Sequence, residues 1–148
     1  MRRLARTPRT EAEVRENLGQ KGLPENRLEE IVAELLRLGY IDDRRFAAAF
    51  ARGRCERGYG RARIRREMAE RGFAGAAIEA AVAGLDRDFG ELDVLRSALA
   101  KRLRTRGEPK TPQELKNLID HLILRGFSPE TIRSELRDFF KRILGKPG

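Results

Sequence analysis

The sequence is poor in the side chains from which most catalytic and metal sites are built. It contains one cysteine, Cys55, one histidine, His121, and no tryptophan. One cysteine cannot form an internal disulfide or a multi-cysteine metal site, and one histidine excludes a cage of several histidines. The chain also lacks a phosphate-binding glycine loop and a Ser/His/Asp arrangement. We therefore expect a protein that is not an enzyme and that holds no metal or cofactor.

Long apolar runs are missing as well. No segment approaches the roughly 20 apolar residues that a membrane span needs. The opening segment MRRLARTPRT is basic but lacks the apolar region of a signal peptide. We expect a soluble, cytoplasmic protein that makes no membrane contact.

What the sequence has in abundance is charge and helix-forming residues. Charged residues make up 37% of the chain, the formal net charge is +9 and the pI is near 10.5. Alanine, leucine, glutamate and arginine dominate, and β-branched residues never form an alternating run, so we expect an all-α protein. The excess of positive charge indicates an acidic partner, such as nucleic acid or an anionic protein surface.

Glycine, proline and capping residues divide the chain into helices. Thr10 with Glu13, and Thr111 with Glu114, have the spacing of capping boxes, and Ser128 is a third N-cap. The predicted helices cover residues 10–21, 24–38, 43–57, 61–71, 75–84, 91–104, 112–125 and a last helix from 129 onward.

A repeat appears when the chain is aligned on Gly22, Gly72 and Gly126. A basic residue precedes each glycine, an apolar residue follows it, and apolar residues stand four and eight positions before it. The flanking residues are Lys21, Arg71 and Arg125 before the glycines, and Leu23, Phe73 and Phe127 after them. The pattern recurs about every 50 residues, which is typical of repeat proteins.

The helices left over between these pairs make each repeat a unit of three helices. We predict a truncated first repeat at residues 1–41, a second at 42–85, and a third with a short C-terminal tail at 86–148. Units this small bury little surface, so they should lean on one another in an elongated, curved row.

The second repeat begins with the segment 42–73, which carries most of the excess charge. Residues 43–72 hold ten arginines and four acidic residues. Its expected structural positions are the caps, the inward-facing apolar residues and the glycines of the turns: Asp42, Asp43, Phe46, Phe50, Gly58, Gly60, Ile64 and Gly72.

Three candidates for chemistry favour structural interpretations. Asp42 and Asp43 precede an apolar helix, so we interpret them as caps rather than as an acid/base pair. Cys55 lies in an arginine-rich helix that could lower its pKa, but we interpret it as a small buried residue. His121 lies off the apolar stripe of its helix, so we expect a solvated surface position.

The arginines that follow residue 56 favour a functional interpretation. Several stand in the first turns of the helix that starts at residue 61, where the positive end of the helix dipole disfavours cations. Local rules are broken mainly at functional sites, helix N-termini can bind anions, and an aromatic ring between glycines could stack on a partner. The predicted partner-binding residues are Arg57, Tyr59, Arg61, Arg63, Arg65 and Arg66.

A stand-alone nucleic-acid-binding protein with tandem helix-turn-helix units is an alternative, and a scaffold that binds only protein is another. Against base reading, the second helix of the middle pair, GAAIEAAVAGL, has no Arg, Lys, Asn or Gln for base edges. Direct DNA binding should weaken steeply with salt, whereas a partner-dependent protein should act where bare DNA is hardly bound.

The segment LGYIDDRRFAAAF, followed by RGYGRARIRREMAERGF, resembles the central signature of the RecX regulatory proteins. The resemblance covers the chain from about Leu4 to Leu144 and departs from the family in the short N-terminus. It implies tandem three-helix repeats and a monomeric, non-enzymatic modulator of the RecA recombinase, acting in homologous recombination, DNA repair and the SOS response. Such a protein would bind the RecA–single-stranded-DNA filament and inhibit its ATPase, strand exchange and extension. Direct contact with DNA, and the choice between filament capping and groove binding, are left open.

Overall fold

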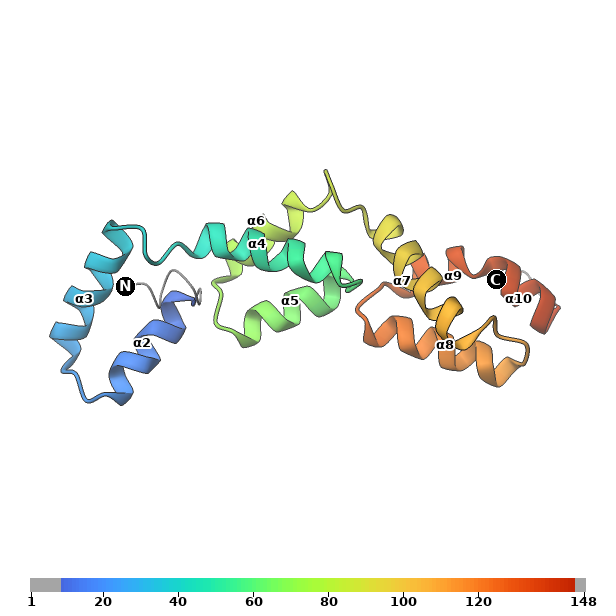
Figure 1. The fold of residues 1–148 in the computed structure, drawn as a ribbon, viewed down its shortest axis with the longest axis horizontal. Helices are drawn as coiled ribbons and strands as arrows, with labels where there is room; N and C mark the ends of the chain where they lie inside the picture. The colour runs from blue at the N-terminus through green and yellow to red at the C-terminus, as the bar shows by residue number, and fades with distance from the viewer. Residues whose placement is uncertain (1–8, 146–148) are drawn as a thin grey trace. The chain divides into compact units, whose positions relative to one another are not determined.

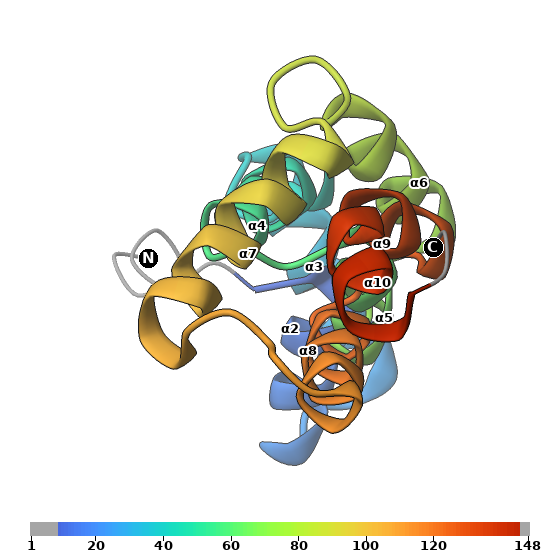
Figure 2. The same cartoon turned by 90° about the vertical axis from the view of Figure 1, so that its right-hand side faces the viewer.

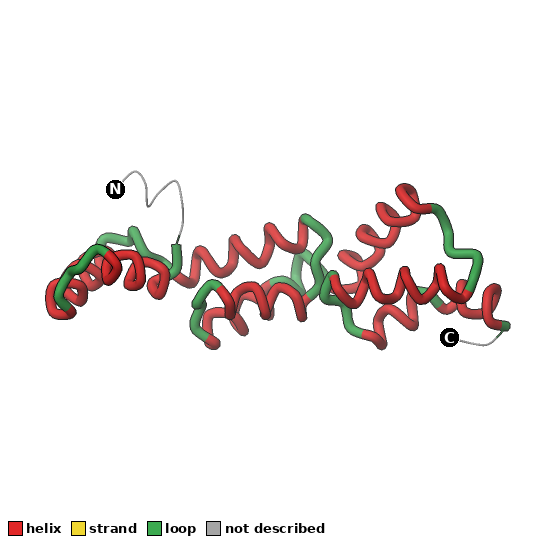
Figure 3. The backbone as a smooth tube through the Cα atoms, turned by 90° about the horizontal axis from the view of Figure 1, so that it is seen from below, coloured by secondary structure: helices red, strands yellow, loops and turns green. Residues whose placement is uncertain are grey.

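The computed structural model describes residues 9–145, and all regular secondary structure in this range is helical (Figure 3). The prediction of an all-α protein is confirmed within this range. The helices are α2 (Glu11–Gln20), α3 (Glu25–Arg37), α4 (Asp43–Glu56), α5 (Arg61–Glu70), α6 (Gly75–Gly84), α7 (Glu91–Arg106), α8 (Pro112–Leu124), α9 (Pro129–Glu135) and α10 (Arg137–Leu144).

The predicted caps form as expected from local sequence. Thr10 and Glu13 make a reciprocal capping box at the start of α2, and the side chains of Thr111 and Ser128 accept hydrogen bonds at the starts of α8 and α9. Helix α3 begins at Glu25, and Pro24 stands at its N-cap without a side-chain hydrogen bond.

The last helix differs from the prediction of one continuous element. It divides at Leu136, whose φ of −95° and ψ of 12° depart from helical values. The bend allows α9 to contact both α7 and α8, while α10 also contacts α8. Figure 2 shows α10 continuing from α9 in a new direction.

By its internal contacts the chain divides into two compact units, and each is described by itself. The first unit contains the chain up to Ala51 together with Arg66–Gly84, and the second contains Arg52–Arg65 together with the chain from Leu85 onward. The division into three repeats ending at residues 41 and 85 stays a prediction. Among the described residues, no helix is long and apolar enough to cross a membrane.

In the first unit, α2 and α3 lie side by side and are joined by the turn at Gly22 (Figure 1). Val14 of α2 packs with Val32 and Leu35 of α3 and with Ile41, and Leu18 and Leu28 lie against this cluster. These are the positions that the helical spacing of apolar residues assigns to the inner faces.

The turn after α5 also packs against the start of α2 within this unit. The Thr10 hydroxyl donates to the Arg71 carbonyl at 3.0 Å, and the Arg71 guanidinium forms two hydrogen bonds of 2.9 Å to Glu13. Burial raises the pKa of Glu13, but the hydrogen bonds from Arg71 and Thr10 outweigh it and leave the pKa lowered. Gly72 has a φ of +89°, and a Cβ there would lie 2.8 Å from the Ala12 Cβ. Gly72 is therefore needed both for its conformation and for this close approach.

Three phenylalanines form a ring cluster in the first unit. The Phe46 centroid lies 6.3 Å from that of Phe50 and 5.0 Å from that of Phe73. The Arg71 guanidinium covers the cluster, at 5.0 Å from the Phe46 centroid. Phe73 is buried, while Phe46 and Phe50 are half-buried.

We predict that Phe46→Ala lowers the free energy of unfolding by about 2–3 kcal/mol, below the roughly 3–5 kcal/mol typical of a fully buried phenylalanine. The half-exposed ring is the reason for the smaller loss. Urea unfolding followed by circular dichroism measures the change. An unchanged midpoint would contradict the assignment of Phe46 to this cluster.

The second unit is built from α7, α8, α9 and α10, with the end of α4 and the start of α5. Helix α9 lies against α7 and α8. The fully buried side chains of this unit include Leu95, Leu115, Leu122, Ile132 and Leu136.

Candidate functional site

The turn between α4 and α5 begins with a glycine-dependent helix end. Gly58 has a φ of +84°. Its N–H donates to the Cys55 carbonyl at 2.9 Å, and the Tyr59 N–H donates to the Arg54 carbonyl at 3.0 Å. These two bonds form a Schellman motif, which a residue with a Cβ would strain at position 58.

The start of α5 is held by the turn that follows α8, 60 and more residues later in the chain. The Gly60 N–H donates to the Arg125 carbonyl at 2.7 Å, and the Ala62 N–H donates to the Gly126 carbonyl at 3.1 Å. A Cβ on Gly60 would lie 2.5 Å from the Gly126 carbonyl carbon and oxygen. The sequence suggested that N–H groups at this helix start could bind an anion, but those of Gly60 and Ala62 are already bonded within the chain.

Tyr59 is part of an intramolecular cluster with arginines. The guanidinium carbons lie 4.0 Å (Arg125), 4.5 Å (Arg63) and 5.9 Å (Arg54) from the centroid of its ring. Such contacts are typical of cation–π interactions, and the Tyr59 side chain is half-buried. The ring thus helps to hold the turn, and its stacking on a partner stays a prediction.

Arg125 is a residue of this candidate site that sequence reasoning missed. Its guanidinium donates from Nε to the Gly58 carbonyl at 3.2 Å and also donates to the Arg57 carbonyl. It therefore closes the end of α4 in addition to contacting Tyr59. The signal was present in the repeat, since Arg125 aligns with Arg71, but it indicated only a base at a helix end.

The six predicted partner-binding residues divide by burial. Arg57, Arg65 and Arg66 are exposed, Tyr59 and Arg63 are half-buried, and Arg61 is buried with only 8% of its surface accessible. Arg63 donates to the Leu124 carbonyl at 3.2 Å, and Arg66 pairs with Glu70 at 3.9 Å.

Arg61 is bound by the loop that precedes α7. Its guanidinium donates to Asp86 at 3.0 Å and to the Phe89 carbonyl at 2.8 Å, and it lies 3.9 Å from the Cys55 sulfur. The side chain points into the second unit and is well supplied with acceptors. This arrangement suits a residue that positions α5 rather than one that presents charge.

The other predicted structural positions are placed as follows. The Asp42 carboxylate accepts from the Arg45 N–H at 3.1 Å, as an N-cap of α4 does, and the Asp43 carboxylate accepts from the Glu11 N–H at 3.0 Å. Ile64 is fully buried. The interpretation of Asp42 as a cap rather than as a catalytic acid agrees with these bonds.

The structure agrees with the sequence-based expectation for Cys55 and differs from it for His121. Cys55 is buried as expected, and burial raises the pKa of its thiol although Arg61 opposes the shift. His121 is half-buried rather than solvated, because it faces α7. Burial, together with Arg102, Arg125 and Arg106, lowers the pKa of its imidazole.

Among residues 9–145, no group of three or more His, Cys, Asp or Glu side chains could hold a metal ion.

Comparison with known proteins identifies similar sequences. The family model described as "RecX, second three-helix domain" matches residues 42–82. A regulatory protein RecX from Xanthomonas axonopodis pv. citri is 34% identical over 134 residues, covering 90% of this chain and 81% of that protein. One from Streptomyces coelicolor is 34% identical over 130 residues, covering 86% of this chain and 68% of that protein.

Solved structures show the same fold. The crystal structure of RecX from Lactobacillus salivarius matches with a TM-score of 0.78 and 19% identity, covering 93% of this chain and 89% of that one. A crystal structure of a regulatory protein RecX matches with a TM-score of 0.76 and 23% identity, covering 91% and 67%.

Proposed function

This chain belongs to the RecX family of regulatory proteins, and on that premise we propose that it is a negative regulator of the RecA recombinase. It binds the RecA–single-stranded-DNA filament as a monomer and inhibits ATP hydrolysis, strand exchange and filament extension. Its cellular role would lie in homologous recombination, DNA repair and the SOS response.

The observation that carries the proposal is the exposed positive charge around the braced turn between α4 and α5. Arg57 stands just before the turn, and Arg65 and Arg66 lie on the helix that follows it, all three exposed. A filament that contains a DNA strand carries one negative charge for each phosphate, so an exposed cationic surface favours association.

The bracing of this turn supports the choice of site. Arg125 bonds to the carbonyls of Arg57 and Gly58, and Tyr59 lies against Arg63 and Arg125. Holding the backbone in place reduces the ordering cost of binding. We assign contact with the filament to Arg57, Arg65 and Arg66, and assign positioning to Tyr59, Arg61 and Arg63.

ATP hydrolysis by RecA on single-stranded DNA tests the proposed function. We expect the rate to fall as the protein is added and to be strongly reduced near equimolar protein and RecA. A rate that stays unchanged at that ratio contradicts the proposal.

A charge-removal variant tests the assigned surface. We predict that Arg57→Gln/Arg65→Gln/Arg66→Gln raises the concentration needed for half-inhibition by about tenfold, or about 1.4 kcal/mol. The cause is the loss of three exposed cations.

The matched control is Arg27→Gln/Arg133→Gln/Arg137→Gln, which removes the same charge from exposed positions on α3, α9 and α10. It should inhibit nearly as well as the wild type. Equal loss in both variants would mean that net charge, rather than this surface, decides binding. Circular dichroism spectra should be the same for all three proteins.

A further inference from the structure

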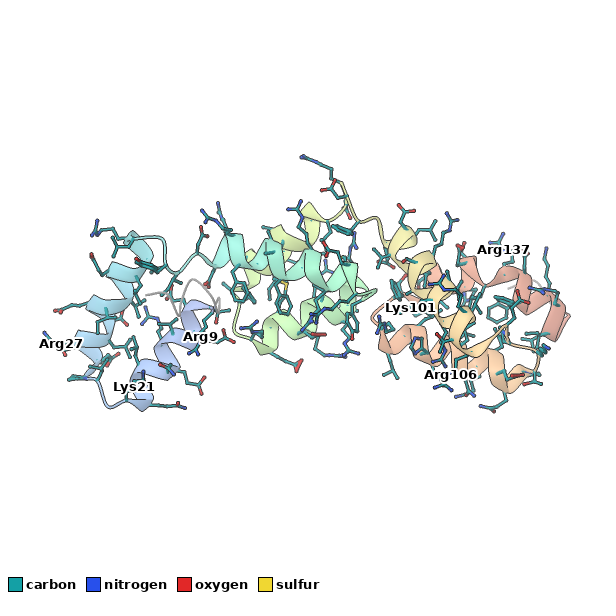
Figure 4. All side chains as sticks on the ribbon, viewed as in Figure 1. Arg9, Lys21, Arg27, Lys101, Arg106 and Arg137 are labelled. Atoms are coloured by element: carbon teal, nitrogen blue, oxygen red, sulfur yellow. The ribbon has the colours of Figure 1, made fainter. Side chains whose placement is uncertain are left out.

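A second concentration of positive charge lies within the second unit. An open cavity of about 290 Å³ is lined by α7, by the last turn of α8 with Arg125, and by the end of α4 with the turn after it. Five basic side chains line it: Arg57, Lys101, Arg102, Arg106 and Arg125. Figure 4 shows Lys101 and Arg106 along α7. Among the lining residues that the structure describes, Glu56 alone carries a carboxylate.

No ion pair within the described part of the chain neutralises the charges of this cavity. Among residues 9–145, Lys101, Arg102 and Arg106 form no ion pair within 4.0 Å. By contrast, Arg61 and Arg96 are each paired with a carboxylate. Each cation on its own is ordinary for a surface helix. Their convergence from separate segments on one hollow is not required by the fold, because the apolar core of α7 is formed by Val94, Leu95, Ala98 and Leu99.

His121 also lines the cavity, and the pKa of its imidazole is sensitive to the positive charges there. Burial lowers the pKa of the imidazole, and Arg102, Arg125 and Arg106 lower it further. At neutral pH the ring is therefore uncharged and offers one N–H donor and one acceptor nitrogen. A bound anion would offset the positive charge of these arginines and so raise the pKa of the imidazole.

The chemistry of the lining selects the kind of anion. Guanidinium groups match phosphate oxygens with paired N–H donors, and a lysine adds a compact positive charge. The volume is at the small end of ligand cavities, which fits a nucleotide-sized group. A single carboxylate would neutralise few of the five cations, whereas successive phosphates along a strand would neutralise several.

We propose that the cavity between α7, α8 and the end of α4 binds phosphate groups, with Arg102, Arg106 and Arg125 as the ligands of the phosphate and His121 as an additional hydrogen-bonding group. The ligand class is a nucleotide or a nucleic-acid strand. The site goes beyond the regulation of RecA, because it acts on phosphate in the absence of any other protein.

One consequence is that phosphate binding is coupled to protonation of the His121 imidazole. The pKa of His121 lies below its ordinary 6.5 in the free protein, and a bound phosphate raises it. Binding then takes up a proton in the pH range between the two values, so affinity for a phosphodiester strand increases as pH falls through that range. Arg102, Arg125 and Arg106 act on the imidazole, and the other charged residues that line the cavity with it are Arg57, Lys101 and Glu56.

The single histidine makes a direct experiment possible, because the imidazole signals in the NMR spectrum of this chain all come from His121. The His121 ring protons are followed while three probes are added at constant ionic strength: inorganic phosphate, a thymidine mononucleotide, and a single-stranded oligothymidylate. We expect a saturable shift of the His121 signals and a higher titration midpoint with at least one probe, and neither with sodium chloride.

The three probes distinguish the source of the phosphate. Tightest binding of the oligothymidylate assigns the site to a strand, and tightest binding of the mononucleotide or of inorganic phosphate assigns it to a free ligand. No saturable shift with any probe overturns the proposal. RecA is absent from every sample, so failure here leaves the proposed regulation of RecA intact.

A pair of variants tests the named residues. Arg102→Gln/Arg106→Gln should weaken binding of the tightest probe by at least tenfold and raise the His121 titration midpoint in the free protein. Arg133→Gln/Arg137→Gln, with the same change in net charge outside the cavity, should bind within about twofold of the wild type. Equal weakening in both overturns the assignment, and matching melting temperatures establish that the variants are folded.

Discussion

Gly126→Ala is expected to lower the free energy of unfolding by about 3 kcal/mol or more. Gly126 has a φ of +102°, a conformation that costs a residue with a Cβ roughly 1–2 kcal/mol. The added Cβ would also lie 2.6 Å from the Arg63 backbone nitrogen and 2.9 Å from the Gly60 oxygen. Because these contacts involve backbone atoms, they cannot be relieved by rotating a side chain.

Relief of this clash requires the start of α5 to move away from the turn after α8. That movement breaks the hydrogen bonds from Gly60 and Ala62, each worth about 1 kcal/mol. It also withdraws Arg125 from the end of α4 and from Tyr59. We therefore expect lost stability and weaker inhibition of RecA together.

Urea unfolding with circular dichroism measures the loss, and Gly53→Ala is the matched control. Gly53 lies inside α4, and a Cβ there meets nothing within 4 Å. Alanine at this position should stabilise the helix by up to about 1 kcal/mol. Wild-type stability in Gly126→Ala would refute the close approach of the two backbones.

Arg61→Met is expected to destabilise the protein by about 2–3 kcal/mol, whereas Arg65→Met changes stability by no more than about 0.5 kcal/mol. The substitution at 61 removes the donor to the Phe89 carbonyl and to Asp86. Asp86 loses little, because 80% of its side chain is exposed to water. The larger part of the loss comes from the Phe89 carbonyl, which loses its donor, because methionine retains most of the packing of the arginine stem.

The same two substitutions separate positioning from contact. Below its melting temperature, folded Arg61→Met should still inhibit RecA, because the exposed arginines are unchanged. Folded Arg65→Met should inhibit less well at equal concentration. If Arg61→Met is fully stable but inactive, Arg61 touches the partner and its assignment as a positioning residue is wrong.

The repeat also accounts for a similar contact in each unit, where a glycine turn packs against the start of a helix. These two turns are called the docked turns. Gly72 approaches the start of α2 in the first unit, and Gly126 approaches the start of α5 in the second. In the alignment of the repeats, Thr10 corresponds to Gly60, and Arg71 corresponds to Arg125. The arginine before each glycine lies over aromatic rings in both cases, over Phe46 and Phe50 in the first unit and over Tyr59 in the second.

The two docked turns differ in charge. At the first, Arg71 is paired with Glu13. The residue that corresponds to Glu13 at the second is Arg63, which shares the Tyr59 ring with Arg125. The same scaffold therefore carries an ion pair in one copy and two arginines in the other, which places positive charge in the second unit.

Local interactions let the sequence by itself determine the helices, the repeat and the family. Helix ends depend on residues a few positions apart, so capping boxes and glycines identify them without tertiary information. Thr10, Thr111, Ser128 and Gly58 are examples. The net positive charge is a property of composition, and the motifs LGYIDDRRFAAAF and RGYGRARIRREMAERGF are enough to suggest the family.

Only the tertiary structure decided which way the arginines point and what they contact. Arg61 and Arg65 are one helical turn apart and look alike in the sequence, but the loop 86–89 covers one and leaves the other exposed. Arg125 reaches Tyr59 across more than 60 residues of chain, and His121 is half-buried because α7 lies beside it. Burial and pairing depend on which distant segment packs against a helix face, and no local pattern encodes that choice.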